Sequence, residues 1–270
     1  MNCKICDGPA PHVFDLPARK ATGGDLVPAD DDGRLAHFYE CERCRFLFSD
    51  VKDVDDGFYE HGYTGTMYSP EPGSEIQYMR LIHMATQLLD RKPLWSCRIL
   101  DYGCGVGHFV KTARQYLGMS VYGYDLAQNG GNEADDHIFS SLPDMRFDII
   151  VAREVVEHFV NPRDSFATMK RLLNPGGVIA FQTNLYEPGV HDRTWGYIGP
   201  LNGHISLYSK GALRALQDQL DVARIQTWRD HATVVAWKLR PGWLAGTAQA
   251  LEGWYSRLKE RRRMRRARWG

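Results

Sequence analysis

The sequence predicts an α/β fold in which a doubly wound, mostly parallel sheet is joined to a small N-terminal module. Three observations support this prediction. Strands and helices alternate from residue 98 onward, a glycine-rich stretch follows the first of these strands, and two Cys-x-x-Cys pairs lie within residues 1–50. Alternation of this kind is typical of a parallel sheet covered by helices.

The composition is that of an ordinary globular chain. Its 270 residues suffice for one large domain or for a domain with a small module. Lys plus Arg and Asp plus Glu both number 33, so the net charge gives no general attraction to nucleic acid or acidic substrates. The N-terminus has no basic-then-apolar signal, and no apolar run approaches about 18 residues, so we expect a cytoplasmic protein.

The hydrophobic pattern predicts the individual elements. A helix begins at Ser74, which can act as its N-cap, with Gln77 at the capping-box position. Residues 147–152 are continuously apolar, as in a strand buried on both faces. The expected strands are 98–102, 120–125, 137–141, 147–152, 178–184, 222–228 and 232–239, and the further expected helices are 107–117, 161–173 and one after 209.

Three glycines, Gly103, Gly105 and Gly107, follow the first strand in "DYGCGVG". Ligands of an open parallel sheet bind beyond the carboxyl ends of its strands. Glycine permits positive φ and lets a ligand approach the backbone closely. Asp125 ends the next strand, where an acid can hold ribose hydroxyls. The pattern therefore predicts a nucleoside-bearing cofactor, with a simple tight turn as the alternative.

The segment "LDYGCGVGHF" resembles motif I of the class I S-adenosylmethionine (SAM)-dependent methyltransferases. The segments "VYGYD", "FDIIVAREVVEHF" and "LLNPGGVIAFQTN" resemble later motifs of the family, in its order. The resemblance covers about residues 74–240 and implies a Rossmann-like fold with SAM as cofactor. It also implies that the three glycines face the amino-acid end of SAM, that Asp125 binds the ribose, and that Asp101 supports the loop or the methionine ammonium group.

One segment departs from the family pattern. Between Asp125 and Phe147, where the family usually has a full helix and strand, the chain is short and rich in Gly and Asn. The expected adenine contacts are therefore Leu126 and a residue near Ile138–Phe139. The chain divides into an expected zinc-binding module (1–50), a linker with a lid helix (51–97), the methyltransferase domain (98–240) and an amphipathic, basic C-terminal helix (241–270).

The zinc prediction rests on four cysteines, Cys3, Cys6, Cys41 and Cys44. Each Cys-x-x-Cys pair presents two thiolates on one tight turn, and two pairs complete a tetrahedron for structural Zn²⁺. Disulfides and free thiols are the alternatives. A cysteine module ahead of a methyltransferase domain resembles the sugar C-methyltransferases and their relatives in glycan and natural-product clusters.

Carboxylates and imidazoles follow the strand at 147–152. The spacing of Glu154, Glu157 and His158 predicts that one helical turn aims all three inward, and His204 follows the strand at 178–184. The set resembles the Glu-x-x-Glu-His and distant His that bind Mg²⁺ in small-RNA 2′-O-methyltransferases, and the Glu-His segment of ubiquinone-pathway O-methyltransferases. A histidine base is a second interpretation, and helix capping with packing is a third.

The long segment 186–204 is rich in aromatic residues, Gly and Pro, and a loop of this length is usually functional or disordered. We expect it to cover the acceptor. The expected walls of the acceptor pocket are Tyr63, Tyr68, Tyr186, His191, Trp195 and Tyr197. Core packing is the alternative for these rings.

The C-terminal segment 241–270 combines helically spaced apolar residues with a basic end. One interpretation is a docked helix with a solvated tail. Another is a peripheral membrane contact with anionic lipid headgroups. Nucleic acid is the least favoured partner.

These features together predict SAM-dependent methyl transfer to a small polar acceptor, a sugar or glycan-linked metabolite, with O-methylation favoured over C-methylation. One alternative is an RNA 2′-O-methyltransferase, which the zero net charge disfavours. The other is a non-catalytic binding module with a methyltransferase fold, which the intact glycine loop and its acid disfavour.

Overall fold

The computed structural model describes residues 1–17, 35–51, 74–89, 92–126, 135–200, 203–229 and 233–239. The predicted pocket residues Tyr63 and Tyr68 and the predicted helix at 241–270 lie outside these ranges. Within them, no helix is long and apolar enough to cross a lipid bilayer.

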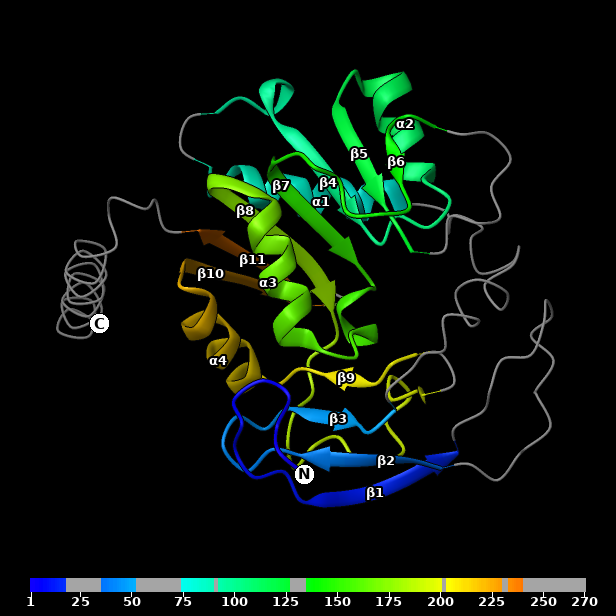
Figure 1. The fold of residues 1–270 in the computed structure, drawn as a ribbon, viewed down its shortest axis with the longest axis vertical. Helices are drawn as coiled ribbons and strands as arrows, with labels where there is room; N and C mark the ends of the chain where they lie inside the picture. Colours follow the sequence, from blue (N-terminus) through cyan, green and yellow to red (C-terminus); the bar gives the residue numbers. More distant parts are fainter. Residues whose placement is uncertain are drawn as a thin grey trace, which may run out of the picture.

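A seven-stranded sheet forms the centre of the molecule, with the strand order β10-β11-β8-β7-β4-β5-β6 (Figure 1). Its strands are β4 (Arg98–Tyr102), β5 (Ser120–Tyr124), β6 (Ile138–Phe139), β7 (Phe147–Arg153), β8 (Leu173–Thr183), β10 (Val222–Arg229) and β11 (Thr233–Leu239). The strands from β8 to β6 pair in parallel, while β11 runs antiparallel to both β8 and β10. The predicted mostly parallel α/β sheet is confirmed.

Helices cover both faces of this sheet. The buried side chains of α1 (Ser74–Thr86) and α2 (His108–Leu117) share one core cluster, and those of α3 (Pro162–Leu172) and α4 (Lys210–Leu220) share the other. Pro162 occupies the first turn of α3, and the Ser209 hydroxyl caps α4 by accepting a hydrogen bond from the Ala212 amide at 3.0 Å.

Two details differ from the sequence expectations. Ile76, an apolar residue in the first turn of the predicted helix, is 60% exposed, because α1 packs through its later turns around Leu81 and Ile82. Strand β8 starts at Leu173 rather than at 178, because Leu173 pairs with Phe147 before a register shift between Phe147 and Ile149.

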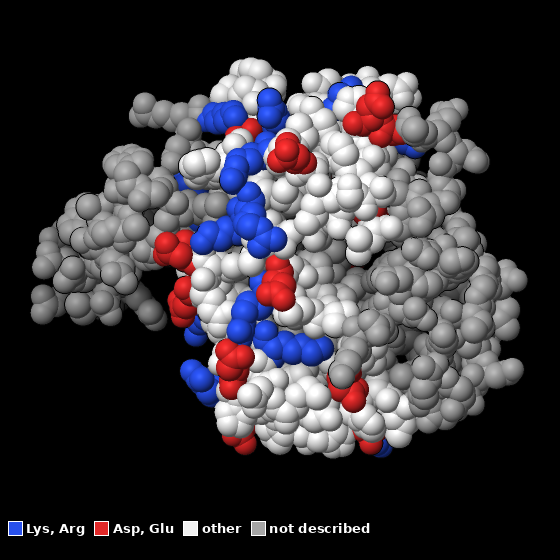
Figure 2. Space-filling view, in the orientation of Figure 1, with Lys and Arg blue, Asp and Glu red and all other residues white. Residues whose placement is uncertain are grey.

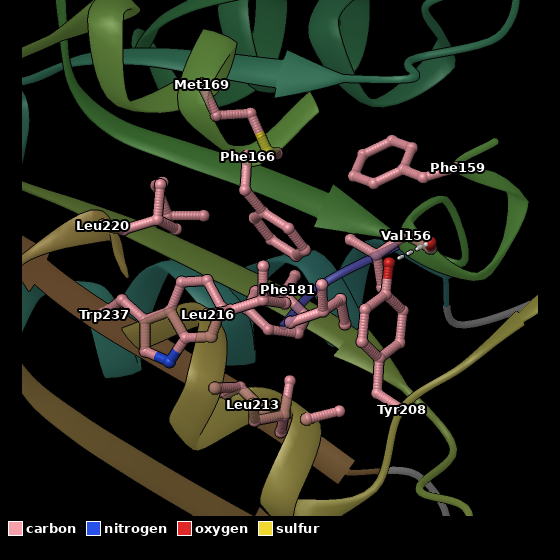
Figure 3. Close-up of a cluster of buried hydrophobic side chains, with 14 of the residues drawn as sticks. Val156, Phe159, Phe166, Met169, Phe181, Tyr208, Leu213, Leu216, Leu220 and Trp237 are labelled. Atoms are coloured by element: carbon pink, nitrogen blue, oxygen red, sulfur yellow. Dashed lines mark hydrogen bonds between the residues drawn. The ribbon is translucent and has the colours of Figure 1, made fainter. Parts of the chain in front are cut away.

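The larger core is built around aromatic rings from α3, β8 and β11. Phe166 packs against Phe181 and Trp237 with ring centroids 5.2 and 4.9 Å apart (Figure 3). Tyr208 contacts the same cluster, and its hydroxyl donates a 2.8 Å hydrogen bond to the Val156 carbonyl (Figure 3). This bond ties the segment after β8 to the segment after β7.

A second sheet, in the order β1-β2-β3-β9, lies below the first in Figure 1. Strands β1 (His12–Pro17), β2 (Leu35–Glu40) and β3 (Leu47–Ser49) come from the N-terminal module, while β9 (Ser206–Leu207) comes from the chain that follows β8 of the central sheet. All pairings in this sheet are antiparallel. The N-terminal module is therefore completed by a strand more than 150 residues later in the sequence.

Basic and acidic side chains are interspersed on the face shown in Figure 2. Two basic side chains donate hydrogen bonds to backbone carbonyls: Arg146 donates to the Leu173 carbonyl, and Lys170 donates to the Leu220 carbonyl. Mixed charge of this kind does not form the single-sign surface that nucleic-acid binding favours.

Candidate active site

The glycine loop lies at the carboxyl end of β4. Gly103, Gly105 and Gly107 have φ values of 79°, 54° and 73°, so the predicted need for left-handed backbone is confirmed at all three. A Cβ atom on Gly103 would lie 2.5 Å from Val155 Cγ2, and one on Gly107 would lie 2.0 Å from Ile138 Cδ1. The loop therefore packs closely against the segment that follows β7 and against β6.

Asp125 follows β5 directly and lies beside the loop. Its Oδ2 atom accepts a 2.7 Å hydrogen bond from the Gly105 amide. The predicted juxtaposition of this acid with the glycines is thus present. Leu126, the predicted adenine contact, is 64% exposed at the same edge, and Ile138 is the neighbour of Gly107.

Asp101 lies within β4 and is fully buried. The Tyr78 hydroxyl is a hydrogen-bond partner of this carboxyl group. Burial raises the pKa of Asp101 to about 8 and the carboxylate of Asp125 adds to the effect, while the Tyr78 hydrogen bond and the Arg153 guanidinium oppose it. A buried carboxylate is stabilised by a cation bound beside it, such as the predicted methionine ammonium group.

Without ligand, Asp101→Asn should be more stable than the wild type, and this difference in stability should grow as the pH rises. The carboxyl has an unfolded pKa near 3.8 and a folded pKa of about 8, so the folded state binds the extra proton and loses stability across that interval. An amide has no such penalty. We expect the thermal midpoint to fall more between about pH 5 and about pH 8 for the wild type than for the variant. Equal pH dependence in calorimetric melts would contradict this assignment.

A cluster of one carboxyl group and two imidazoles follows β7 and β8. One ligand atom each from Glu157, His158 and His204 lies within 4.8 Å of the others, and the two imidazole centroids are 4.9 Å apart. The Ile205 amide donates a 3.1 Å bond to the Glu157 carbonyl and holds the two segments together. The structure thus brings together three of the four predicted catalytic residues.

Burial shifts the pKa values of Glu157 and His158 towards their neutral forms. The pKa of Glu157 is raised by burial and by the neighbouring Glu154. The pKa of His158 is lowered to about 3 by burial and by His204. A hydrogen bond with the Gly203 backbone opposes the lowering of the His158 pKa. Neutral imidazole is the form that accepts a proton or binds a metal ion.

Glu154 corrects the predicted helical turn. Its φ is 51°, and the 3₁₀ turn that follows covers only Val156–His158, so the Glu154 side chain does not share a helical face with Glu157. Instead, Tyr197 links the two carboxyl groups, because its hydroxyl lies 3.2 Å from Glu154 Oε2 and 2.5 Å from Glu157 Oε1. Gln182 donates a further bond to Glu154 Oε1 at 3.1 Å.

The aromatic loop after β8 has a different arrangement from the one expected. Tyr186 is 5% exposed and its hydroxyl donates to Glu40 Oε2 at 2.9 Å, so it packs on the N-terminal sheet in place of the predicted role as a pocket wall. His191 stacks on Trp195 at 3.9 Å between centroids, and Trp195 lies 5.3 Å from Tyr197. Within this loop, the Tyr197 hydroxyl bonds to the carboxyl groups of Glu154 and Glu157.

Two contributors to this site carried no recognisable sequence signal. Gly203 has a φ of 78°, and a Cβ there would lie 2.5 Å from His158 Nδ1, so only glycine lets this backbone approach the ring. Tyr78 of α1 is stacked on Phe109 at 4.2 Å and lies close to Asp101. In the sequence, Tyr78 is an ordinary aromatic residue of an amphipathic helix.

The four cysteines of the N-terminal module converge as predicted. Their sulfur atoms all lie within 4.8 Å of one another, with Cys3–Cys44 at 3.6 Å and Cys6–Cys41 at 3.4 Å, and none forms a disulfide. The edge of a tetrahedron of thiolates around Zn²⁺ is about 3.8 Å when each Zn–S bond is about 2.3 Å. A hydrogen bond from Cys44 lowers the pKa of Cys3 to about 5, which favours a thiolate there.

The family model described as a methyltransferase domain matches residues 65–225, more than half of the chain. The chain is 30% identical over 129 residues to a ubiquinone biosynthesis O-methyltransferase of Thiobacillus denitrificans, covering 42% of this chain and 53% of that protein. It is 29% identical over 140 residues to one of Aromatoleum aromaticum, covering 46% and 57%. The chain thus matches about half the length of these relatives.

A solved plantazolicin methyltransferase in complex with SAH is 14% identical, with a TM-score of 0.46 and coverage of 62% of this chain and 85% of that one. The family match covers the glycine loop, Asp125 and the Glu–His cluster. The chain therefore belongs to the methyltransferase domain family, with the class I SAM-dependent methyltransferase domain that its motifs predict.

Proposed function

We propose that this protein transfers the methyl group of SAM to a hydroxyl oxygen of a small polar acceptor. The observation that supports this most strongly is the contact between the two halves of the site. Gly103 of the cofactor loop packs against Val155, which lies between Glu154 and Glu157 of the Glu–His cluster. A methyl group carried at the loop would therefore lie near the segment that holds the Glu–His cluster, so that cofactor and acceptor can be held together.

His204 is the proposed proton acceptor. Its Nδ1 atom lies 2.8 Å from the Tyr197 carbonyl, which can only accept, so Nδ1 carries the hydrogen and Nε2 presents a lone pair. In the proposed reaction the acceptor oxygen attacks the methyl carbon, the carbon–sulfur bond breaks, and the hydroxyl proton passes to Nε2. The products are a methyl ether and S-adenosylhomocysteine.

A bound divalent cation is a second arrangement of the same residues, supported by the convergence of one ligand atom from each of Glu157, His158 and His204 within 4.8 Å of one another. Glu157, His158 and His204 would hold it, and the cation would lower the pKa of the acceptor hydroxyl. Two imidazoles and one carboxylate favour a transition metal such as Fe²⁺ or Zn²⁺ over the Mg²⁺ expected from sequence, because Mg²⁺ prefers oxygen ligands. Metal analysis of the wild type and Glu157→Gln would decide: the cation is supported only if the variant loses one ion per chain.

Two kinds of hydroxyl compound fit this reaction as acceptors. The curated relatives named above act in ubiquinone biosynthesis by their names, which favours a phenolic hydroxyl, while the sequence interpretation favours a sugar. Incubation with deuteromethyl-SAM and a panel of catechols and nucleotide sugars, followed by mass spectrometry, tests both. Absence of SAM binding by calorimetry would overturn the proposal altogether.

We further propose that Cys3, Cys6, Cys41 and Cys44 hold a structural Zn²⁺. The sulfur–sulfur distances near the tetrahedral edge support this, as does the absence of a disulfide among these residues. Four sulfur ligands leave no open position for substrate, so the ion would act in folding rather than chemistry.

Removal of this zinc should destabilise the N-terminal module. A structural zinc contributes directly to folding free energy, because the unfolded chain has no preformed site. We expect Cys44→Ser to lose one zinc ion per chain in metal analysis and to lower the thermal midpoint by about 5 °C or more. Cys97→Ser is the matched control, since Cys97 is buried outside the cluster. Full zinc content in Cys44→Ser would contradict the site.

A further inference from the structure

We propose that the N-terminal cysteine module positions the acceptor half of the active site, independently of the cofactor half. This inference rests on the proposed function for the roles of His204 and Tyr197. Its structural basis is a set of contacts that link the module to those residues through one short strand and one loop.

The first link is β9, which directly follows His204 and Ile205. Its residues Ser206 and Leu207 pair with Phe48 and Leu47 of β3, and the Ser49 amide donates a 2.9 Å bond to the Ile205 carbonyl. The position of His204 therefore depends on a strand whose partner belongs to the module. A strand of two residues has little stability without such a partner.

The other edge of this strand reaches the catalytic segment. The Ser206 hydroxyl donates to the Phe159 carbonyl at 2.6 Å, and the Ile205 amide donates to the Glu157 carbonyl at 3.1 Å. The 205–206 segment thus joins the module on one side and the Glu157–Phe159 segment on the other. Displacement of β3 would move both imidazoles relative to the cofactor loop.

The second link is the aromatic loop that carries Tyr197. Tyr186 and Ile198 are buried against the module in one hydrophobic cluster with Phe38 and Leu47. The Tyr186 hydroxyl bonds to Glu40 at the end of β2, and Glu40 in turn pairs with Arg45. The module is therefore the surface on which this loop rests.

The cysteine turns themselves are fastened to the catalytic half. The Ser209 hydroxyl donates to the Cys44 carbonyl at 2.6 Å, and a Cβ on Gly211 would lie 2.6 Å from the same oxygen. On the first turn, Arg163 and Gln219 both donate to the Ile5 carbonyl, each with a 2.6 Å contact. These bonds fix the backbone of both cysteine turns against α3 and α4. The positions of the turns and of the two helices therefore depend on each other.

The glycine loop of the cofactor half is held by bonds to its own neighbours. The Gly105 amide donates to Asp125 at 2.7 Å, and the Gly103 and Cys104 amides donate to the Tyr124 carbonyl of the neighbouring strand. The module reaches this half through the shared hydrophobic cluster around Leu100 and Tyr124, beneath the loop. Because the loop is held by its own hydrogen bonds, loosening of the module should affect acceptor chemistry and leave SAM affinity intact.

Two variants in the full chain test this separation. Tyr186→Phe removes the bond to Glu40 with little change in volume, and Gly211→Ala pushes against the Cys44 carbonyl. Val13→Thr is the control, because Val13 is exposed on the outer strand of the module. Zinc content, SAM affinity by calorimetry, imidazole ¹H–¹⁵N spectra and kcat are measured for each, with His158 and His204 signals assigned from single His variants.

We expect both test variants to shift the His204 signals, to keep their zinc and SAM affinity within about twofold, and to lower kcat by about tenfold, since small misplacement of a catalytic group is costly. The control should match the wild type. Unchanged His204 signals and kcat in both variants would overturn the inference, as would an equal loss of SAM affinity. If the wild type itself transfers no methyl group, the proposed function fails, while the imidazole spectra still test the positioning.

Discussion

Gly103→Val is expected to abolish SAM binding. The residue has a φ of 79°, which a β-branched residue adopts only with strain. Its Cβ would lie 2.5 and 2.9 Å from the two methyl groups of Val155, so the loop or the segment after β7 must move. Because the loop backbone is the proposed contact for SAM, we expect an affinity loss of about a hundredfold or more. Isothermal calorimetry with SAM measures it directly.

A matched control separates strain from loss of the site. Gly118 also has a positive φ, 61°, but a Cβ there would meet nothing within 4 Å. Gly118→Ala should lower stability by about 1 kcal/mol through backbone strain alone and leave SAM affinity unchanged. Comparable SAM affinity in Gly103→Val and the wild type would show that the cofactor binds elsewhere, and would remove the basis of the proposed reaction.

Loss of turnover without loss of SAM binding is the second large effect, expected for Glu157→Gln and His204→Asn. Glutamine keeps an oxygen that can accept the Tyr197 hydrogen bond at 2.5 Å but removes the ionisable group. Asparagine can keep a donor for the Tyr197 carbonyl, which His204 Nδ1 contacts at 2.8 Å, but has no counterpart of Nε2. We expect kcat to fall by about 10²–10⁴-fold in each, the usual range for a lost general base or metal ligand.

His83→Ala is the control for these two variants, because His83 is an exposed residue of α1 that bonds to Gln87. Its kcat and SAM affinity should equal those of the wild type. Retained turnover in His204→Asn would exclude both the proton-acceptor role and the metal-ligand role of this residue. A parallel fall in SAM affinity would mean that the Glu–His cluster serves the cofactor instead.

The α/β domain was largely predictable because its elements follow local rules. The helix start at Ser74 and the continuous apolar run of β7 depend on a few neighbouring residues, and the structure has both features. The positive φ of the three loop glycines follows equally from the absence of a Cβ. The convergence of four cysteines follows from their paired spacing, which matches the geometry of a metal site.

Local rules were insufficient where the backbone leaves a regular element. The expected helical turn at Glu154 was wrong because this residue adopts a left-handed conformation, which spacing alone does not reveal. Tyr186 and Tyr197 lie in one aromatic loop, yet one is buried on the N-terminal sheet and the other bonds to Glu157. Both are tyrosines in the same aromatic-rich segment, so only the path of the loop backbone decides which of them is buried on the sheet and which reaches Glu157.

The sequence alone thus determined the family, the cofactor edge of the sheet and the residues available for chemistry, because these depend on short-range patterns. Only the tertiary structure decided how these residues meet. The pairing of β3 with β9 joins segments more than 150 residues apart, and it brings His204 beside Glu157. Such long-range contacts depend on the packing of the whole core, and short sequence patterns do not specify that packing.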